Sequence, residues 1–181
     1  MEKERKLQVV TGGTSGMGLA TAKALGEYGP VLIGGRNKER LERAMKELKA
    51  AGVEAYGKNC DISDPESLQE FVAYAVEIAP IGNVVNAAGV DFDNASAELI
   101  AKINMQGTHY VLEAFLPHLD HSTVLNYSSI TGYYYQAKKE DIEVWKHPDA
   151  EDFCEKALAL IPEPADPRTA RLGPAYGAYT C

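Results

Sequence analysis

The chain has 181 residues, of which 45% are hydrophobic and 24% charged, values that suit one globular domain and leave little room for a second. Its formal net charge of −8 argues against a nucleic-acid partner, because such a partner requires a basic face. The cysteines Cys60, Cys154 and Cys181 are unclustered, so neither a disulfide framework nor a metal site is expected. Without a long apolar stretch or a signal peptide after the charged start MEKERK, we expect a cytoplasmic protein that does not bind membranes.

The first two thirds of the chain alternate between short apolar runs and helical patterns. The apolar runs predict buried strands over 7–11, 31–35, 53–59, 83–89 and 122–129. The helical patterns between them include 37–50, 65–79 and 95–118. Ser63 or Asp64 is expected to cap the second of these helices, with Pro65 in its first turn. Such alternation with nearly all-apolar strands predicts a parallel sheet covered on both faces, that is, a doubly wound α/β fold.

Residues 130–172 break this rhythm. They contain no strand pattern, two short helical patterns near 138–146 and 149–161, and a proline-rich run. We interpret 130–175 as a helical insertion or lid within a single domain that spans 1–181. Its aromatic side chains either line an apolar substrate pocket or pack the insertion onto the domain; they are Tyr133, Tyr134, Tyr135, Trp145 and Phe153.

The strongest local signal is the stretch VVTGGTSGMGLATAKAL at 9–25, where Gly12, Gly16 and Gly18 follow a strand and open a helix. Glycines there let the backbone turn tightly and approach a pyrophosphate, whose charge is stabilised by the N–H groups at the helix N-terminus. An ordinary tight turn between a strand and a helix is the alternative interpretation. The position at the first strand–helix junction of an alternating chain favours a dinucleotide-binding site.

Four motifs, in order along the chain, resemble the short-chain dehydrogenase/reductase family. TGGTSGMG (11–18) resembles the family's cofactor loop and NAAG (86–89) the end of its fourth strand. KINMQG (102–107) resembles a helix that carries a functional asparagine, and VLNYSSITG (124–132) the fifth strand with its serine. The resemblance implies a Rossmann fold, here without the family's C-terminal strands. It also implies cofactor contacts from Gly12, Thr14, Ser15, Gly16, Met17, Gly18, Asp61, Ile62, Asn86, Ala87, Ala88 and Gly89.

The residues after the second predicted strand bear on the choice of cofactor. A carboxylate at the end of that strand would bind the adenosine ribose and favour NAD, but this position holds Gly35, and Arg36 follows. An arginine forms charge-assisted hydrogen bonds with a 2′-phosphate, so the sequence favours NADP, with NAD as the alternative. A solvated charge at the start of a helix is the alternative role for Arg36. Asp61 matches the family's contact with the adenine amino group, and a cap or turn is its alternative role.

Hydride transfer to a carbonyl requires a proton donor for the developing alkoxide and a hydrogen bond that holds the oxygen. By the family resemblance, Ser129 holds the oxygen, a tyrosine donates the proton, and Asn104 helps to position a water. The alternative for Asn104 is a polar residue in the helix interior that faces solvent. A lysine one helical turn after the tyrosine lowers the pKa of that tyrosine. Tyr135 does have Lys139 four residues on, but it follows Ser129 by only six residues, which leaves little room for the strand-to-helix connection.

The last residues, AYGAYTC, resemble the start of the family's Tyr-x-x-Ser-Lys motif. Tyr179, Thr180 and Cys181 fill its first three positions, so Ser and Lys would be the next two residues. Tyr176 is the rival, but the residue four positions on is Thr180, which carries no charge. We therefore expect Tyr179 to be the catalytic tyrosine and the 181-residue chain alone to be inactive or nearly so.

The motifs predict an NADP-dependent oxidoreductase that acts on a small-molecule carbonyl or secondary alcohol. The segment lengths resemble the 3α-hydroxysteroid dehydrogenase/carbonyl reductase subgroup, which implies an apolar, ring-bearing or steroid-like substrate. A catalytically silent cofactor-binding or interaction module is the alternative, because the lysine and the last strands are missing. Sugar-nucleotide epimerase chemistry is disfavoured, since the chain has no second substrate-binding half. The insertion lies where the family often builds its oligomer interface, so we expect a homodimer in place of the usual tetramer.

Overall fold

The computed structural model describes residues 5–134, 141–161, 175 and 178–179. These residues divide into two compact units. The sheet unit comprises the described parts of Met1–Ala88 and Tyr110–Tyr127, and the helical unit those of Gly89–His109 and Ser128–Cys181.

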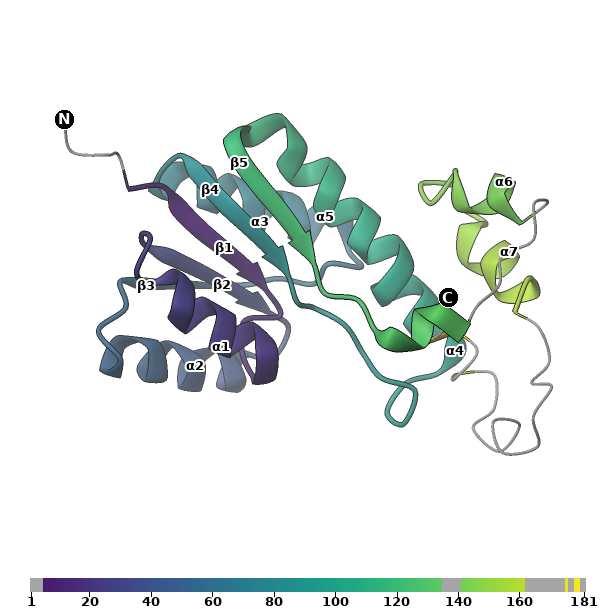
Figure 1. Ribbon diagram of the computed structural model, residues 1–181, viewed down its shortest axis with the longest axis horizontal. Helices are drawn as coiled ribbons and strands as arrows, with labels where there is room; N and C mark the ends of the chain where they lie inside the picture. Colours follow the sequence, from purple (N-terminus) through teal and green to yellow (C-terminus); the bar gives the residue numbers. More distant parts are fainter. Residues whose placement is uncertain (1–4, 135–140, 162–174, 176–177, 180–181) are drawn as a thin grey trace. The chain divides into compact units, whose positions relative to one another are not determined.

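The sheet unit contains five parallel strands in the order β3-β2-β1-β4-β5 (Figure 1). The strands are β1 (Leu7–Thr11), β2 (Val31–Gly35), β3 (Ala55–Asn59), β4 (Ile81–Asn86) and β5 (Leu119–Asn126). All five residues of the central strand β1 are buried, as expected for a strand that is covered on both faces. The doubly wound parallel fold predicted from the sequence is therefore confirmed.

Helices cover both faces of this sheet. They are α1 (Gly16–Leu25), α2 (Lys38–Ala50), α3 (Pro65–Ile78) and α5 (Thr108–Phe115). Figure 1 shows α1 and α2 in front of the sheet, with α3 and α5 behind it. In front, Ala44 and Leu48 of α2 are buried in an apolar core with Ile33 of β2. Behind the sheet, Phe71 of α3 meets Phe115 of α5 edge to face, with ring centroids 6.4 Å apart.

Side chains at the helix starts explain where two of these helices begin. Asn37 precedes α2 and accepts a hydrogen bond from the backbone N–H of Arg40 (2.8 Å). Asp64 precedes α3 and accepts one from the N–H of Glu66 (3.1 Å), with Pro65 in the first turn as predicted. These caps fix the connections that follow β2 and β3, where the sequence places three of the cofactor contacts, Arg36, Asp61 and Ile62.

The segment between β4 and β5 differs from the sequence prediction in one respect. The single helix expected over 95–118 consists of α4 (Ala97–Ile100), the π-helix η1 (Ala101–Gly107) and α5, and then the 3₁₀ turn η2 (Leu116–His118) that leads into β5. After β5 come the 3₁₀ turn η3 (Ile130–Tyr134), α6 (Ile142–Trp145) and α7 (Phe153–Ala159). Among the described residues, no helix is long and apolar enough to span a membrane.

Candidate functional site

The glycine loop between β1 and α1 is shaped by contacts that only glycine allows. Gly12 has φ +68°, and a Cβ there would lie 2.5 Å from the backbone nitrogen of Ala88. A Cβ at Gly18 would lie 2.3 Å from the carbonyl oxygen of Gly12. The loop is therefore folded tightly against the residues that follow β4, and α1 starts close to the end of β1.

The N-terminus of α1 is suited to bind an anion. Ser15 occupies the cap position in an extended conformation, but its hydroxyl makes no capping hydrogen bond. The helix begins at Gly16, has no acidic residue in its first turn, and exposes 67% of Met17. Because the first N–H groups of a helix have no partner within the helix, they remain available to an anion such as a pyrophosphate.

A buried hydrogen bond joins the ends of β1 and β4. The Thr11 hydroxyl donates to Oδ1 of Asn86 at 2.6 Å, and the Ala87 N–H donates to the Thr11 carbonyl at 3.0 Å. These bonds hold Asn86, Ala87 and Ala88 beside the glycine loop, where the sequence predicts cofactor contacts. The sequence reasoning did not identify Thr11, although its place as the last residue of β1 and the first of the glycine motif was a usable signal.

The end of β2 lies beside the same loop. Gly35 is half-buried, and a Cβ there would lie 2.6 Å from Cγ2 of Thr14. Arg36 is exposed, and within the described part of the chain its guanidinium forms no ion pair or hydrogen bond. The amide of Asn59 donates to the carbonyls of both Gly35 and Arg36. The sequence did not identify Asn59 as a residue that holds the end of β2.

Asp61 and Ile62 follow β3. The Asp61 Oδ1 accepts hydrogen bonds from the N–H (3.0 Å) and the hydroxyl (2.7 Å) of Ser63, and the Asp61 N–H donates to the Ser67 hydroxyl (3.0 Å). Asp61 therefore does have the turn-forming role that was the alternative for it, while its contact with adenine stays a prediction. Ile62 is buried.

Cys60 is the buried neighbour of Asp61. Burial, with a smaller contribution from the charge of Asp61, raises the pKa of the Cys60 thiol to about 12. A thiol with this pKa is protonated at neutral pH and is not a nucleophile. Burial and the raised pKa therefore both disfavour a reactive thiolate at this position.

Asn104 lies within the π-helix of the helical unit and holds the segment that follows β4. Its Oδ1 accepts from the Val90 N–H and its Nδ2 donates to the Val90 carbonyl, both at 2.9 Å. The hydroxyl of Thr108 donates to the Asn104 carbonyl at 2.8 Å. A π-turn is a frequent feature of functional sites because it displaces backbone groups from the regular helical pattern. Gly89 is adjacent, since a Cβ there would lie 3.4 Å from the Asn104 Oδ1.

Ser129 lies beyond the end of β5, which stops at Asn126. Because the strand stops before both serines, the alternation of side chains along a strand does not distinguish Ser129 from its neighbour Ser128. Ser129 is half-buried and Ser128 exposed. The Ser129 oxygen accepts hydrogen bonds from the Thr131 N–H (3.2 Å) and hydroxyl (2.9 Å), so its own hydrogen can be donated to a ligand.

Tyr179 lies in an apolar cluster of the helical unit. Its ring meets that of Phe92 edge to face at 5.4 Å between centroids. Ala97 and Ile100 of α4 and Leu158 of α7 belong to the same cluster. Tyr135, Lys139 and Tyr176, the other candidates for the tyrosine and its lysine, lie outside the described residues.

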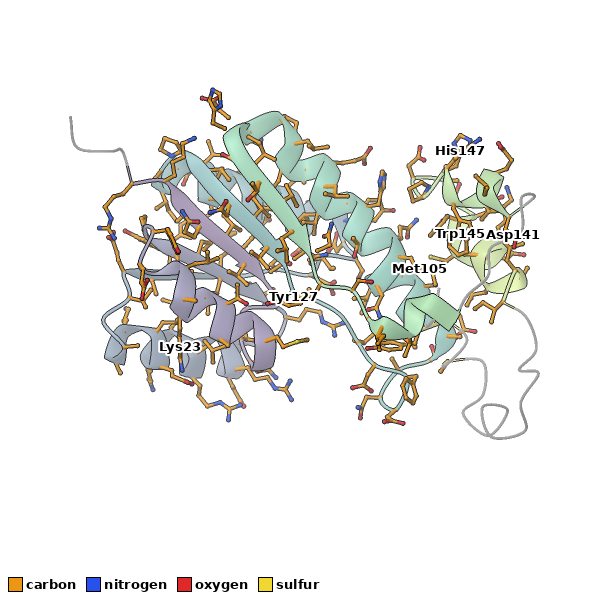
Figure 2. All side chains as sticks on the ribbon, viewed as in Figure 1. Lys23, Met105, Tyr127, Asp141, Trp145 and His147 are labelled. Carbon is orange, nitrogen blue, oxygen red and sulfur yellow. The ribbon has the colours of Figure 1, made fainter. Side chains whose placement is uncertain are left out.

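The insertion is attached to the π-helix through the side chain of Gln106. Its Nε2 donates to the Pro148 carbonyl at 3.3 Å, and the Cys154 thiol donates to its Oε1 at 3.7 Å. Trp145, labelled in Figure 2, packs edge to face on Phe153, with centroids 5.9 Å apart. This contact lies within the insertion, so both roles that the sequence left open for its aromatic side chains stay predictions.

Within each unit, predicted site residues are close together. In the sheet unit, the glycine loop, Asn86–Ala88 and the Gly35–Arg36 segment adjoin one another. In the helical unit, Gly89 and Asn104 are in contact, whereas no contact joins Ser129 or Tyr179 to Asn104 among the described interactions. The described residues contain no cluster of metal-binding side chains.

A family model and a curated protein both match this chain. The family model described as short chain dehydrogenase matches residues 6–140. A protein named "Putative ketoacyl reductase" from Streptomyces coelicolor is 36% identical over 123 residues, which make up 63% of this chain and 47% of that protein. This chain thus spans about half the length of that curated relative.

Two solved structures resemble the chain with similar sequence identities and TM-scores. An actinorhodin polyketide ketoreductase variant with NADPH has 29% sequence identity and a TM-score of 0.62, over 86% of this chain and 62% of that chain. An alcohol dehydrogenase from the archaeon Thermococcus sibiricus, complexed with 5-hydroxy-NADP, has 27% identity and a TM-score of 0.63. That match covers 86% of this chain and 68% of the other.

Proposed function

This chain belongs to the short chain dehydrogenase family, and on that premise we propose that it is the cofactor-binding part of an oxidoreductase that uses NADP(H). The reaction would be hydride transfer between the nicotinamide and a carbonyl or secondary alcohol of a small molecule. The observation that carries the proposal is the start of α1. This helix follows the glycine loop, has no acidic residue in its first turn and has no capping side chain, so its first N–H groups can bind an anion.

The sheet unit supplies the residues that would hold the cofactor. The N–H groups at the start of α1 suit the pyrophosphate, and Asn86–Ala88 form the wall against which the glycine loop folds. Arg36 suits a 2′-phosphate because its guanidinium is exposed and forms no ion pair within the described residues. When bound, NADPH would supply the hydride. Both solved structures described above contain NADPH or an NADP derivative, which supports NADP, with NAD as the alternative.

The helical unit supplies the catalytic groups in this proposal. Ser129 would donate its hydroxyl hydrogen to the substrate oxygen, since the oxygen of Ser129 already accepts two hydrogen bonds from Thr131. The Asn104 carbonyl accepts from Thr108 and has a second lone pair that could hold a water. Tyr179 would donate the proton to the developing alkoxide.

The substrate class in this proposal is an apolar ketone. Ketoacyl compounds, suggested by the name of the Streptomyces relative, and steroid-like ketones, suggested by the segment lengths, are the two types to compare. A cytoplasmic location and a homodimeric assembly stay predictions from the sequence.

A polypeptide of these 181 residues alone has no lysine four residues after Tyr179, so we propose that it binds cofactor with little or no turnover. The alternative function is a cofactor-binding module without any catalytic role. The packing of the Tyr179 ring on Phe92 favours this alternative, because a ring in an apolar cluster has a structural role without chemistry.

Direct titration with NADPH and NADH tests the cofactor part of the proposal. The 181-residue chain is expected to bind NADPH about tenfold or more tightly than NADH, because a hydrogen-bonded charge is worth roughly 1.5–3 kcal/mol. Arg36→Ala should remove most of this difference, whereas Arg43→Ala, another exposed arginine of the same region, should leave it unchanged. A chain that binds neither nucleotide would contradict the proposal.

A further inference from the structure

The end of β2 is held by hydrogen bonds from both neighbouring strands. On the β1 side, the Gly13 N–H donates to the Gly34 carbonyl at 3.1 Å. On the β3 side, the Cys60 N–H donates to the Gly35 carbonyl at 3.3 Å. Both are backbone bonds and would form with almost any sequence. They do not reach the residue that follows, Arg36.

Asn59, the last residue of β3, extends this support by one residue. Its Nδ2 donates to the Gly35 carbonyl at 3.1 Å and to the Arg36 carbonyl at 2.8 Å. A side-chain amide carries two N–H hydrogens, so one nitrogen can serve both acceptors. The side chain is exposed, which means that these bonds are not required to satisfy a buried polar group.

The two carbonyls that Asn59 binds belong to the peptide groups on either side of the Arg36 Cα. Because the orientations of these two peptide planes determine φ and ψ of Arg36, Asn59 fixes the direction in which the Arg36 side chain leaves the backbone. Asn37, the next residue, is fixed in turn by its cap on α2. A long side chain that starts from a fixed backbone loses less conformational entropy when it binds a ligand.

We propose that Asn59 is a positioning residue that orients Arg36 toward the 2′-phosphate of NADP(H). This inference rests on the proposed function, in which Arg36 recognises that phosphate. Asn59 itself does not touch the phosphate in this account. Asn59 sets the preference for NADP(H) over NAD(H) by fixing the backbone of Arg36, the residue that touches the phosphate.

Nucleotide binding by a set of single and double variants of the 181-residue chain tests this assignment. Asn59→Ala removes the amide, Asn59→Leu removes it while keeping the size of the side chain, and Arg36→Ala removes the phosphate ligand. Asn83→Ala is the matched control, because the Asn83 amide donates to Gln8 within the same sheet (2.7 Å). NADPH and NADH dissociation constants are measured for each variant, and also for the double variant Asn59→Ala/Arg36→Ala.

We expect both Asn59 variants to weaken NADPH binding about fivefold and NADH binding less than about twofold. Each variant loses the two neutral hydrogen bonds that position Arg36, and only NADPH has the phosphate that Arg36 binds. In the Arg36→Ala background, Asn59→Ala should change NADPH binding by less than about twofold, because its effect passes through Arg36. Asn83→Ala should leave the ratio of the two dissociation constants unchanged.

Four results would overturn the inference. Equal weakening of NADPH and NADH by Asn59→Ala would show that Asn59 only stabilises the sheet. Additive effects of Asn59→Ala and Arg36→Ala would show that Asn59 does not act through Arg36. Normal NADPH preference in both Asn59 variants, with loss of preference in Arg36→Ala, would refute the role of Asn59 and leave the proposed function intact. A wild-type chain that binds neither nucleotide would refute both.

Discussion

A carboxylate introduced at the end of β2 should damage the glycine loop before it changes the cofactor preference. In Gly35→Asp, the new Cβ would lie 2.6 Å from Cγ2 of Thr14 and 3.2 Å from its hydroxyl oxygen. Carbon atoms in contact are separated by about 3.5–4.0 Å, so either Thr14 or the strand end must move. Overpacking of this kind costs about 1–3 kcal/mol of unfolding free energy.

A second substitution removes the obstruction. Thr14→Ala deletes both close atoms and leaves only the Cβ of residue 14, which lies 3.5 Å from the new Cβ, an ordinary van der Waals contact. The double variant Thr14→Ala/Gly35→Asp should therefore recover the stability lost in Gly35→Asp. Its carboxylate could then bind the ribose hydroxyls and repel a 2′-phosphate, which favours NADH.

Thermal unfolding and nucleotide titrations of the wild type, both single variants and the double variant give the assay. Gly35→Asp should lower the Tm by about 2–12 °C, given roughly 2–4 °C per kcal/mol for a chain of this size, and should bind both nucleotides poorly. The double variant should return toward the wild-type Tm and bind NADH more tightly than NADPH. A Gly35→Asp variant that keeps the wild-type Tm and binds NADH well would refute the steric reasoning.

Two further predictions concern single side chains. Asn104→Ala should lower the unfolding free energy by about 1–3 kcal/mol and expose the Val90 N–H to hydrogen exchange, whereas Asn94→Ala, at an exposed loop amide, should do neither. Unchanged protection at Val90 would contradict the bonds assigned to Asn104. Cys60, whose pKa is raised from 9.0 to about 12, should react with a thiol reagent much more slowly than Cys154 at pH 8. Because the folded-state pKa is raised, the protonated thiol contributes stability that is complete below pH 9 and is lost as the pH rises toward about 12. Denaturation of the wild type and Cys60→Ala across this range measures that loss, and identical pH profiles would contradict it.

The hydrophobic pattern of the sequence was sufficient to predict the sheet. A fully buried parallel strand has no polar face, so runs such as LQVVT and VLIGG could be assigned directly. The cap of α3 was also predictable, since Asp64 and Pro65 stand immediately before an amphipathic pattern. The boundaries of β5 were less accurate, because four of its first five residues, LDHST, are polar and no long apolar run marks its start.

Features that depend on contacts between distant residues were not accessible from the sequence. The π-helix around Asn104 is only 7 residues long and lies between α-helical segments, so apolar periodicity does not distinguish it from an α-helix. The Thr14 side chain beside Gly35 and the Asn59 amide on Arg36 depend on how close β1, β2 and β3 lie at their ends. No spacing along the chain records these distances.

Turnover of a ketone by the product of the complete reading frame is the most direct test of the proposed oxidoreductase function. The wild type is expected to consume NADPH only when a ketone is present, and Tyr179→Phe should reduce this rate by about 10²–10⁴-fold, the usual contribution of a general acid. Tyr56→Phe, which alters a tyrosine of β3 in the sheet unit, should retain the wild-type rate. An absence of turnover with either nicotinamide, or a Tyr179→Phe variant as active as the wild type, would contradict the account.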